Sequence, residues 1–220
     1  MLQLRNLKKM FHLMEPDIEI KEKSKEPSKE SQLHNFSKSS FLAKNPIHFN
    51  EVIALAKVDQ ILWPKGFEPE NCPIHVRNEI SVASSPQNVW MWLVRAQLWP
   101  TWYPNSDNIK FLNGKSPDLA VNTTFQWKTF GITIKSTVRE FVPFERLAWD
   151  ARGAGLTAYH AWLIQSKNEG THIITEETEK GWFARLGKVL RPKRVEQIHQ
   201  VWLERLAEKA MTGLPPATIP

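Results

Sequence analysis

Two titratable side chains in this 220-residue chain stand where proton-transfer chemistry could occur, His160 and Glu177. His160 lies between Ala158 and Trp162 in a run that alternates like a strand, so it shares their apolar face. An imidazole near its ordinary pKa can donate, accept or transfer a proton at neutral pH. Its expected partner on the neighbouring strand is Glu177, or Glu176 if the register differs by one residue.

A His–Glu pair inside an apolar cavity is a candidate general base for an aldol-type cyclisation or a dehydration. The structural alternative is a core histidine whose hydrogen bonds to a carboxylate or to water serve stability alone, because buried polar groups are normally paired. No firm catalytic set follows from the sequence, so an enzyme is the less favoured expectation.

The chain contains ten tryptophans, four of them in the run Trp90–Pro104. Tryptophan is costly to expose and too large to bury without dedicated space. We expect a cavity with aromatic walls, kept small by the indoles themselves; the alternative is that the rings fill the core. The proline-broken segment with Trp99, Trp102 and Tyr103 is expected to form a lid or portal, or an aromatic cluster that caps the sheet. The side chains predicted to bind a ligand are Trp99, Tyr103, Phe125, Trp127, Val138, Trp149, His160, Trp162, Glu177 and Trp202.

Hydrophobic periodicity predicts the elements that position these side chains. Period-two alternation from Pro73 onward indicates a strand, and Ser84-Ser85-Pro86 then provides a helix cap and a first-turn proline. Short connections rich in Gly, Asn and Pro separate the strands that follow, so neighbouring strands should be antiparallel. These strands are expected at residues 108–112, 123–129, 132–142, 146–152, 156–165 and 171–180.

The last of these strands is apolar on both faces, which leaves its register open. Its inward set is either Ile173, Thr175 and Glu177 or His172, Ile174 and Glu176, and we favour the first. After Gly181 the period returns to that of a helix, which Pro192 should break or kink. The second part of this helix is the element best suited to cover the sheet.

Several kinds of chemistry are excluded. The single Cys72 allows no intrachain disulfide and no Cys-based zinc site, and it is consistent with a reducing compartment. The chain has no phosphate-binding glycine loop, no Gly-x-Ser-x-Gly elbow and no His-Glu-x-x-His helix. We therefore expect no metal and no cofactor.

The N-terminal part differs in composition from the rest. Residues 1–46 are rich in Lys, Glu, Ser and Pro and are expected to be a disordered basic extension. Residues 47–72 are expected to form a short helix and a proline-rich connector, and residues 73–213 the main domain. Half of the net charge of +6 falls in the extension, which argues against nucleic acid as a partner of the domain. A cytoplasmic location is expected, since no apolar run is long enough to span a membrane.

A basic run without any acidic residue lies between Gly181 and Val195. It indicates contact with an anionic membrane surface near the point of ligand entry, or simply a solvated helix face. The oligomeric state is not predicted. The basic residues of the run are Arg185, Lys188, Arg191, Lys193 and Arg194.

Three segments resemble the START-like, helix-grip (SRPBCC) superfamily, specifically its polyketide cyclase/dehydrase-like and lipid-transfer-like bacterial proteins. They are EISVASSPQNVWMWLVRAQLWPTWYPNS, TVREFVPFERLAWDARG and AYHAWLIQSKNEGTHIITEETEKGW. The resemblance covers roughly residues 74–210 and implies an α+β helix-grip fold. In this fold a curved antiparallel sheet of six to seven strands wraps a long C-terminal helix, and two short helices follow the first strand. It implies ligands such as lipids, polyketides or other apolar molecules, and it carries over no catalytic motif.

Three hypotheses follow. The first is a domain that binds a small hydrophobic ligand without transforming it. The second is a cyclase/dehydrase-like enzyme that uses His160 and a nearby glutamate. The third is an interaction module with a vestigial cavity, in which the basic extension recruits a partner.

Overall fold

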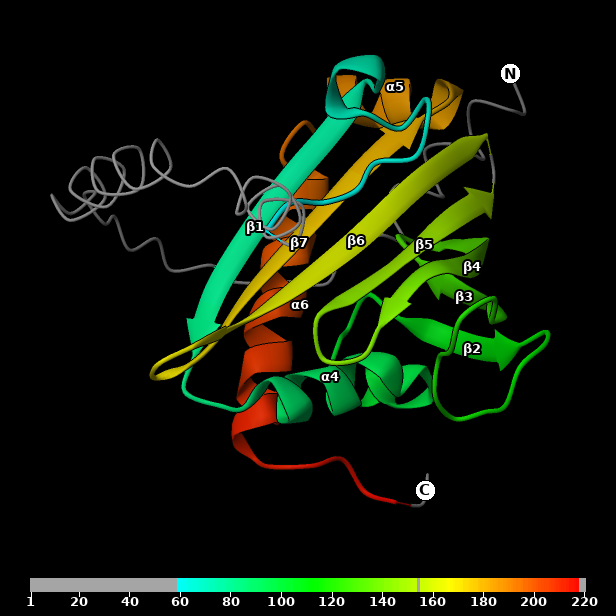
Figure 1. Cartoon of the computed structure of the whole chain (residues 1–220). Coiled ribbons are helices and arrows are strands. Elements are labelled where there is room, and N and C mark those ends of the chain that lie inside the picture. The colour runs from blue at the N-terminus through cyan, green and yellow to red at the C-terminus, as the bar shows by residue number, and fades with distance from the viewer. Residues whose placement is uncertain (1–58, 154, 218–220) are drawn as a thin grey trace, which may run out of the picture. The chain divides into compact units, whose positions relative to one another are not determined.

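Figure 1 shows the computed structural model, which describes residues 59–153 and 155–217. The chain divides into one unit formed by residues 1–15 and 63–220 and a second formed by residues 16–62. The predicted extension at residues 1–46 and most of the predicted helix after it lie outside the described residues. Residues 63–217 of the first unit hold the sheet, the helices and all of the predicted site.

A seven-stranded antiparallel sheet forms the body of this unit, with the strand order β1-β7-β6-β5-β4-β3-β2. Strands that follow one another from β2 to β7 are paired, as the short connections between them predicted. In addition, β1 pairs with β7 at the edge of the sheet. The strands are β1 (Ile74–Val82), β2 (Asp107–Phe111), β3 (Thr124–Thr129), β4 (Ile132–Val142), β5 (Arg146–Gly153), β6 (Leu156–Lys167) and β7 (Gly170–Lys180).

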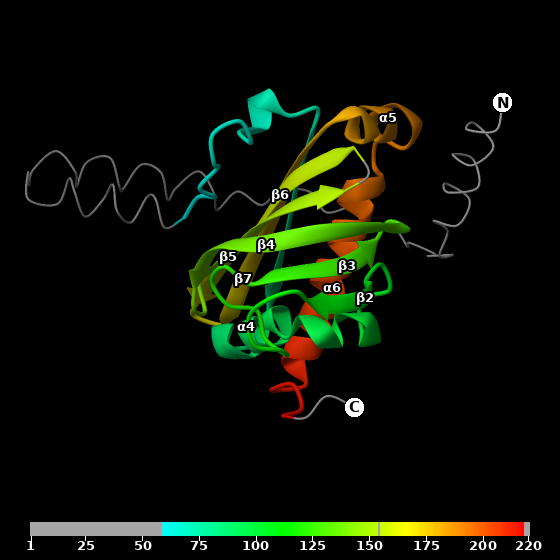
Figure 2. The same ribbon diagram turned by 90° about the vertical axis from the view of Figure 1, so that its right-hand side faces the viewer.

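The helices lie on one face and at the ends of the sheet, as Figures 1 and 2 show. Ser85 caps α4 by accepting a hydrogen bond from the backbone N–H of Asn88 at 3.2 Å. The break expected at Pro192 separates α5 from α6, and α6 packs along the sheet. The helices are α4 (Pro86–Val94), the 3-10 helix η4 (Ala96–Thr101), α5 (Trp182–Leu190) and α6 (Arg194–Met211). The predicted helix-grip α+β fold is confirmed.

Strand β6 is buried on both faces, which explains why its sequence is apolar on both. On its inner face lie His160 and Trp162, and on its outer face Tyr159 is buried as well. The outer face is covered by the connector before β1, where the rings of Trp63 and Phe67 contact Tyr159 at centroid distances of 5.9 and 6.0 Å. The inner face, which also carries Ala158, is the one that alternation predicted for His160.

An aromatic cluster centred on Trp99 fills one part of the space between sheet and α6. Its indole contacts Phe125, Trp127, Trp149 and Trp202, with ring centroids 5.2–5.9 Å apart. The Trp99 side chain is fully buried and its Nε1–H donates to the carbonyl of Leu93 at 2.9 Å. Of the two alternatives for this segment, a lid and an aromatic cluster, the structure shows the cluster, because Trp99, Trp102 and Tyr103 are all buried.

Trp99 should therefore be a stability determinant. Trp99→Ala should lower the free energy of unfolding by about 3–5 kcal/mol, because it leaves a large cavity among four aromatic rings. Urea denaturation followed by circular dichroism measures this change. Val121→Ala, at a position 59% exposed, is the control and should shift stability by less than about 0.5 kcal/mol. A loss below about 1 kcal/mol for Trp99→Ala would contradict the packing described.

Candidate functional site

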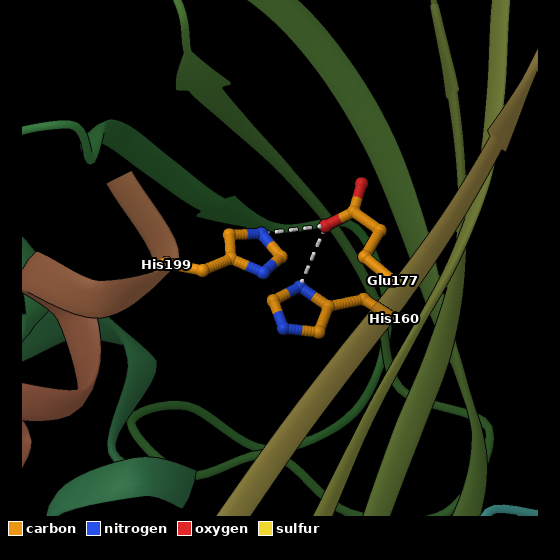
Figure 3. Close-up of side chains that lie close together, drawn as sticks. All are labelled: His160, Glu177 and His199. Carbon is orange, nitrogen blue, oxygen red and sulfur yellow. Dashed lines mark ion pairs between the residues drawn. The ribbon is translucent and has the colours of Figure 1, made fainter. Parts of the chain in front are cut away.

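The register of β6 and β7 places Glu177 directly opposite His160. Thr175 and Ile173 share the inner face with Glu177, so the first of the two registers left open by the sequence is the observed one. Helix α6 adds a residue that the sequence analysis did not select, His199, from the other side of the interior. Strands and helix thus bring two histidines and one glutamate together (Figure 3).

Glu177 joins the three side chains through a single oxygen. Its Oε2 atom lies 3.1 Å from Nδ1 of His160 and 3.0 Å from Nε2 of His199. Both imidazoles are only 2% exposed, and their rings are stacked with centroids 4.6 Å apart. This carboxylate therefore accepts two N–H hydrogen bonds, one from the sheet and one from the helix.

The hydrogen bonds assign different roles to the two histidines. His160 uses both ring nitrogens, because Nε2 also lies 2.7 Å from the hydroxyl of Thr175. Since an ionised carboxylate only accepts, Nδ1 of His160 carries the hydrogen and the hydroxyl donates to Nε2. His199 gives its Nε2–H to Glu177, and among the described residues nothing bonds to its Nδ1. In the described part of the chain, Nδ1 of His199 is therefore buried without a hydrogen-bond partner.

The electrostatics of the cluster hold three groups in different protonation states. Burial lowers the pKa of His160 to about 4 and outweighs the attraction of Glu177, so His160 is neutral at pH 7. Burial alone would raise the pKa of Glu177, but interaction with His160 and the two hydrogen bonds hold it below its usual range. Burial and the neighbouring charge of Glu177 raise the pKa of Glu179, which therefore stays protonated. An ionised carboxylate and a protonated carboxyl group stand side by side.

A cavity of about 80 Å3 adjoins this cluster. Six of the ten residues predicted to bind a ligand line it, together with residues from α5 and the start of α6 that the prediction did not include. The six are Tyr103, Trp127, Trp149, His160, Glu177 and Trp202. The added polar or charged residues are Thr129, Glu179, Arg191, Arg194 and His199.

The other four predicted residues are buried away from the cavity lining. Trp99 and Phe125 belong to the aromatic cluster described above, and Trp162 and Val138 are also buried. Phe125, Val138 and Trp162 share the inner face of the sheet with the lining residues, whereas Trp99 belongs to η4. Strand alternation identifies the face correctly and does not indicate where along that face a cavity opens.

A helical wheel would have indicated His199. It lies three residues before Trp202 and four after Val195, so it shares the helix face that is buried against the sheet. Strand pairing indicates partners for His160 on neighbouring strands only, and His199 lies on a helix.

His160, Glu177 and His199 also have the donor atoms of a transition-metal site, all within 4.8 Å of one another. An ion bound by two imidazoles must lie in the plane of each ring, since the nitrogen lone pairs lie there. The two ring planes are only 12° from parallel and are stacked, so no nearby point lies in both planes. As they stand, these residues fit hydrogen bonding to Glu177 and not shared metal coordination.

Comparisons with known proteins agree with this architecture. The family model described as "Polyketide cyclase / dehydrase and lipid transport" matches residues 73–214. The crystal structure of hypothetical protein jhp0584 from Helicobacter pylori is 30% identical, with a TM-score of 0.65, over 69% of this chain and 96% of that one. No curated protein matches the chain.

Two more distant structures show the fold alone. Ara h 8.0201 is 13% identical with a TM-score of 0.52, over 64% of this chain and 99% of its own. TTHA0849 from Thermus thermophilus is 16% identical with a TM-score of 0.50, over 63% of this chain and 98% of that one. Among the described residues, no helix is long and apolar enough to cross a membrane.

The buried, neutral His160 should make the protein sensitive to acid. Because its pKa is lowered on folding, the unfolded state binds the extra proton first, and stability is lost progressively as the pH falls from about 6.5 to 4. Between pH 7 and 5, wild type should lose about 2 kcal/mol more than His160→Gln, measured by urea denaturation at each pH. Glu179 acts in the opposite direction but is present in both proteins.

His172→Gln, outside the cluster, serves as the control and should keep the pH dependence of wild type. If His160→Gln kept it too, His160 would not be the group responsible.

Proposed function

The chain belongs to the polyketide cyclase/dehydrase and lipid-transport family, and we propose that it binds a small, mainly apolar molecule in the cavity between the sheet and α6. The main support for this proposal is the cavity itself, which has aromatic and aliphatic walls and ends at a group of buried polar atoms. Ligand sites typically combine apolar walls with a few polar groups that fix orientation. In this chain Trp127, Trp149 and Tyr103 are the flat wall residues.

Two buried polar atoms without partners, in residues that line the cavity, support a ligand that carries a polar group. Among the described residues, Nδ1 of His199 lacks a donor and Nε1–H of Trp202 lacks an acceptor. Leaving such atoms unpaired costs about 1–3 kcal/mol each, so a guest that supplies both partners is favoured. A hydroxyl group is the smallest neutral group that both donates and accepts. The cavity therefore suits a ring-sized apolar molecule with a hydroxyl or enol group.

The size of the cavity supports a ring and not a long chain. A water molecule needs roughly 10–15 Å3 of such space, so about 80 Å3 admits a small guest only. A long acyl chain would require the walls to move. The aromatic cluster around Trp99 occupies the space that a larger ligand would need.

2-Naphthol and naphthalene test the proposal directly. Both should bind to the full chain, and 2-naphthol should bind about 5-fold more tightly, the value of one added hydrogen bond. Ala158→Leu, which adds bulk to a buried lining residue, should weaken both ligands at least about 10-fold. Titration calorimetry measures these affinities.

The matched control is Ala120→Leu, at an exposed position outside the lining, which should bind like wild type. If neither ligand binds to wild type, the carrier function fails and the interaction module with a vestigial cavity is favoured instead.

A second function, acid–base catalysis, is favoured by the unused nitrogen of His199. Its Nε2–H is held by the Glu177 carboxylate, which orients the ring and leaves Nδ1 able to take a proton from a ligand in the cavity. Glu179, protonated beside Glu177, could supply a proton to a carbonyl or a leaving hydroxyl. In this arrangement His199 takes the base role that the sequence analysis gave to His160, because both nitrogens of His160 are engaged.

Elimination of 5-nitrobenzisoxazole tests for such a base without knowledge of the natural substrate. The base takes the ring C–H proton while the N–O bond opens to a cyanophenolate, which is detected by absorbance. His199→Gln keeps a donor for Glu177 but loses the basic nitrogen, and it should slow the reaction at least about 10-fold. His160→Gln should retain most of the rate. Equal losses in both variants, or no rate above buffer for wild type, would contradict the assignment.

A further inference from the structure

Helix α5 has two unlike faces. Its inner face is buried against the sheet, where Phe183, Ala184 and Gly187 line the cavity. Its outer face leaves three large apolar side chains in solvent: Trp182 is 56% exposed, Val189 78% and Leu190 55%. Three large exposed apolar side chains are unusual on a nine-residue surface helix, because such helices normally expose polar side chains.

The exposed indole is held in place by close packing against a glycine. A Cβ at Gly155 would lie 1.9 Å from Nε1 of Trp182, so the ring rests directly on the backbone of the β5–β6 turn. The Trp182 side chain is thus both exposed and positioned, as is expected of a residue that inserts into a partner.

Positive charge surrounds these apolar groups. Residues 181–195 carry five basic residues and no acidic one. Arg185, Lys188 and Lys193 are exposed, and in the described part of the chain no acidic side chain forms an ion pair with any of them. Within α5, Arg185 and Lys188 lie on one side of the helix and the large apolar side chains lie beside them on the other. This separation is typical of helices that lie in the headgroup layer of an anionic membrane.

The cavity reaches the surface beside this face. Gly187, Arg191, Arg194 and Val195 all line the cavity and all remain partly exposed. They form the end of α5 and the junction with α6, shown at the same end of the sheet in Figures 1 and 2. A surface that held the outer face of α5 would therefore lie next to the cavity opening.

We propose that the outer face of α5, formed by Trp182, Arg185, Lys188, Val189 and Leu190, docks on an anionic lipid bilayer, and that the cavity exchanges its apolar ligand there. The exchange of ligand at the membrane rests on the proposed function, whereas the docking of α5 does not. Nucleic acid would match the charge but leave the aliphatic groups without a partner. A second copy of the chain would cover the aliphatic groups but bring like charges together.

Co-sedimentation of the full chain with vesicles tests the docking. The chain should bind vesicles of phosphatidylcholine with 30% phosphatidylglycerol and bind those of phosphatidylcholine alone at least about 10-fold more weakly. Raising NaCl from 0.1 to 0.5 M should weaken binding, because salt screens the attraction. Arg185→Glu with Lys188→Glu should reduce binding at least about 10-fold, and Val189→Asp about 5-fold or more.

Matched controls on the β2–β3 loop are Lys115→Glu and Val121→Asp, also exposed, which should bind vesicles like wild type. Equal binding to both kinds of vesicle would overturn the proposal, and so would an equal loss of binding in the control variants. It would also be overturned if wild type were a dimer that Val189→Asp dissociates, because the apolar face would then bind a second copy of the chain.

Binding of 2-naphthol in solution separates the two proposals. Val189→Asp should bind it as wild type does, since Val189 is not part of the lining. Naphthol binding without vesicle binding would leave the proposed function intact and remove the docking surface. Vesicle binding without naphthol binding would retain the docking and remove the cavity ligand.

Discussion

The ionised carboxylate of Glu177 is the group around which this interior is arranged. A buried charge is tolerated only where hydrogen bonds and dipoles replace its lost water. Here the replacement comes from two elements far apart in sequence, His160 on β6 and His199 on α6. The distance between sheet and helix is thereby tied to the reach of two imidazoles, and neither element can move without leaving the carboxylate short of a donor.

The aromatic side chains and the polar cluster meet at Trp149 and Trp202, which contact both Trp99 and His160. The residues around Trp99 pack ring against ring at the side of η4, and no residue of α4 or η4 lines the cavity. The cavity opens instead beside Glu177 and under α5, where Ala184 and Gly187 contribute little volume.

The sequence predicted the sheet, the terminal helix and the pairing of His160 with Glu177, because antiparallel neighbours with short turns leave few registers that keep one face apolar. It did not predict that Trp99 lies in the core, since a proline-broken segment has no periodicity to assign a face. It did not predict His199 either. That residue meets the cluster only through the packing of α6 on the sheet, which depends on contacts between residues distant in sequence.

The same geometry supports binding and catalysis, and the ligand decides between them. A ligand hydroxyl placed beside Nδ1 of His199 would donate a hydrogen bond to it, and no bond of the ligand would have to break. Given a ligand with an acidic C–H next to a carbonyl, the same nitrogen can take the proton while Glu179 donates to the oxygen. A carrier and a cyclase or dehydratase can therefore share this cluster, and they differ in which atoms of the guest are brought within reach of it.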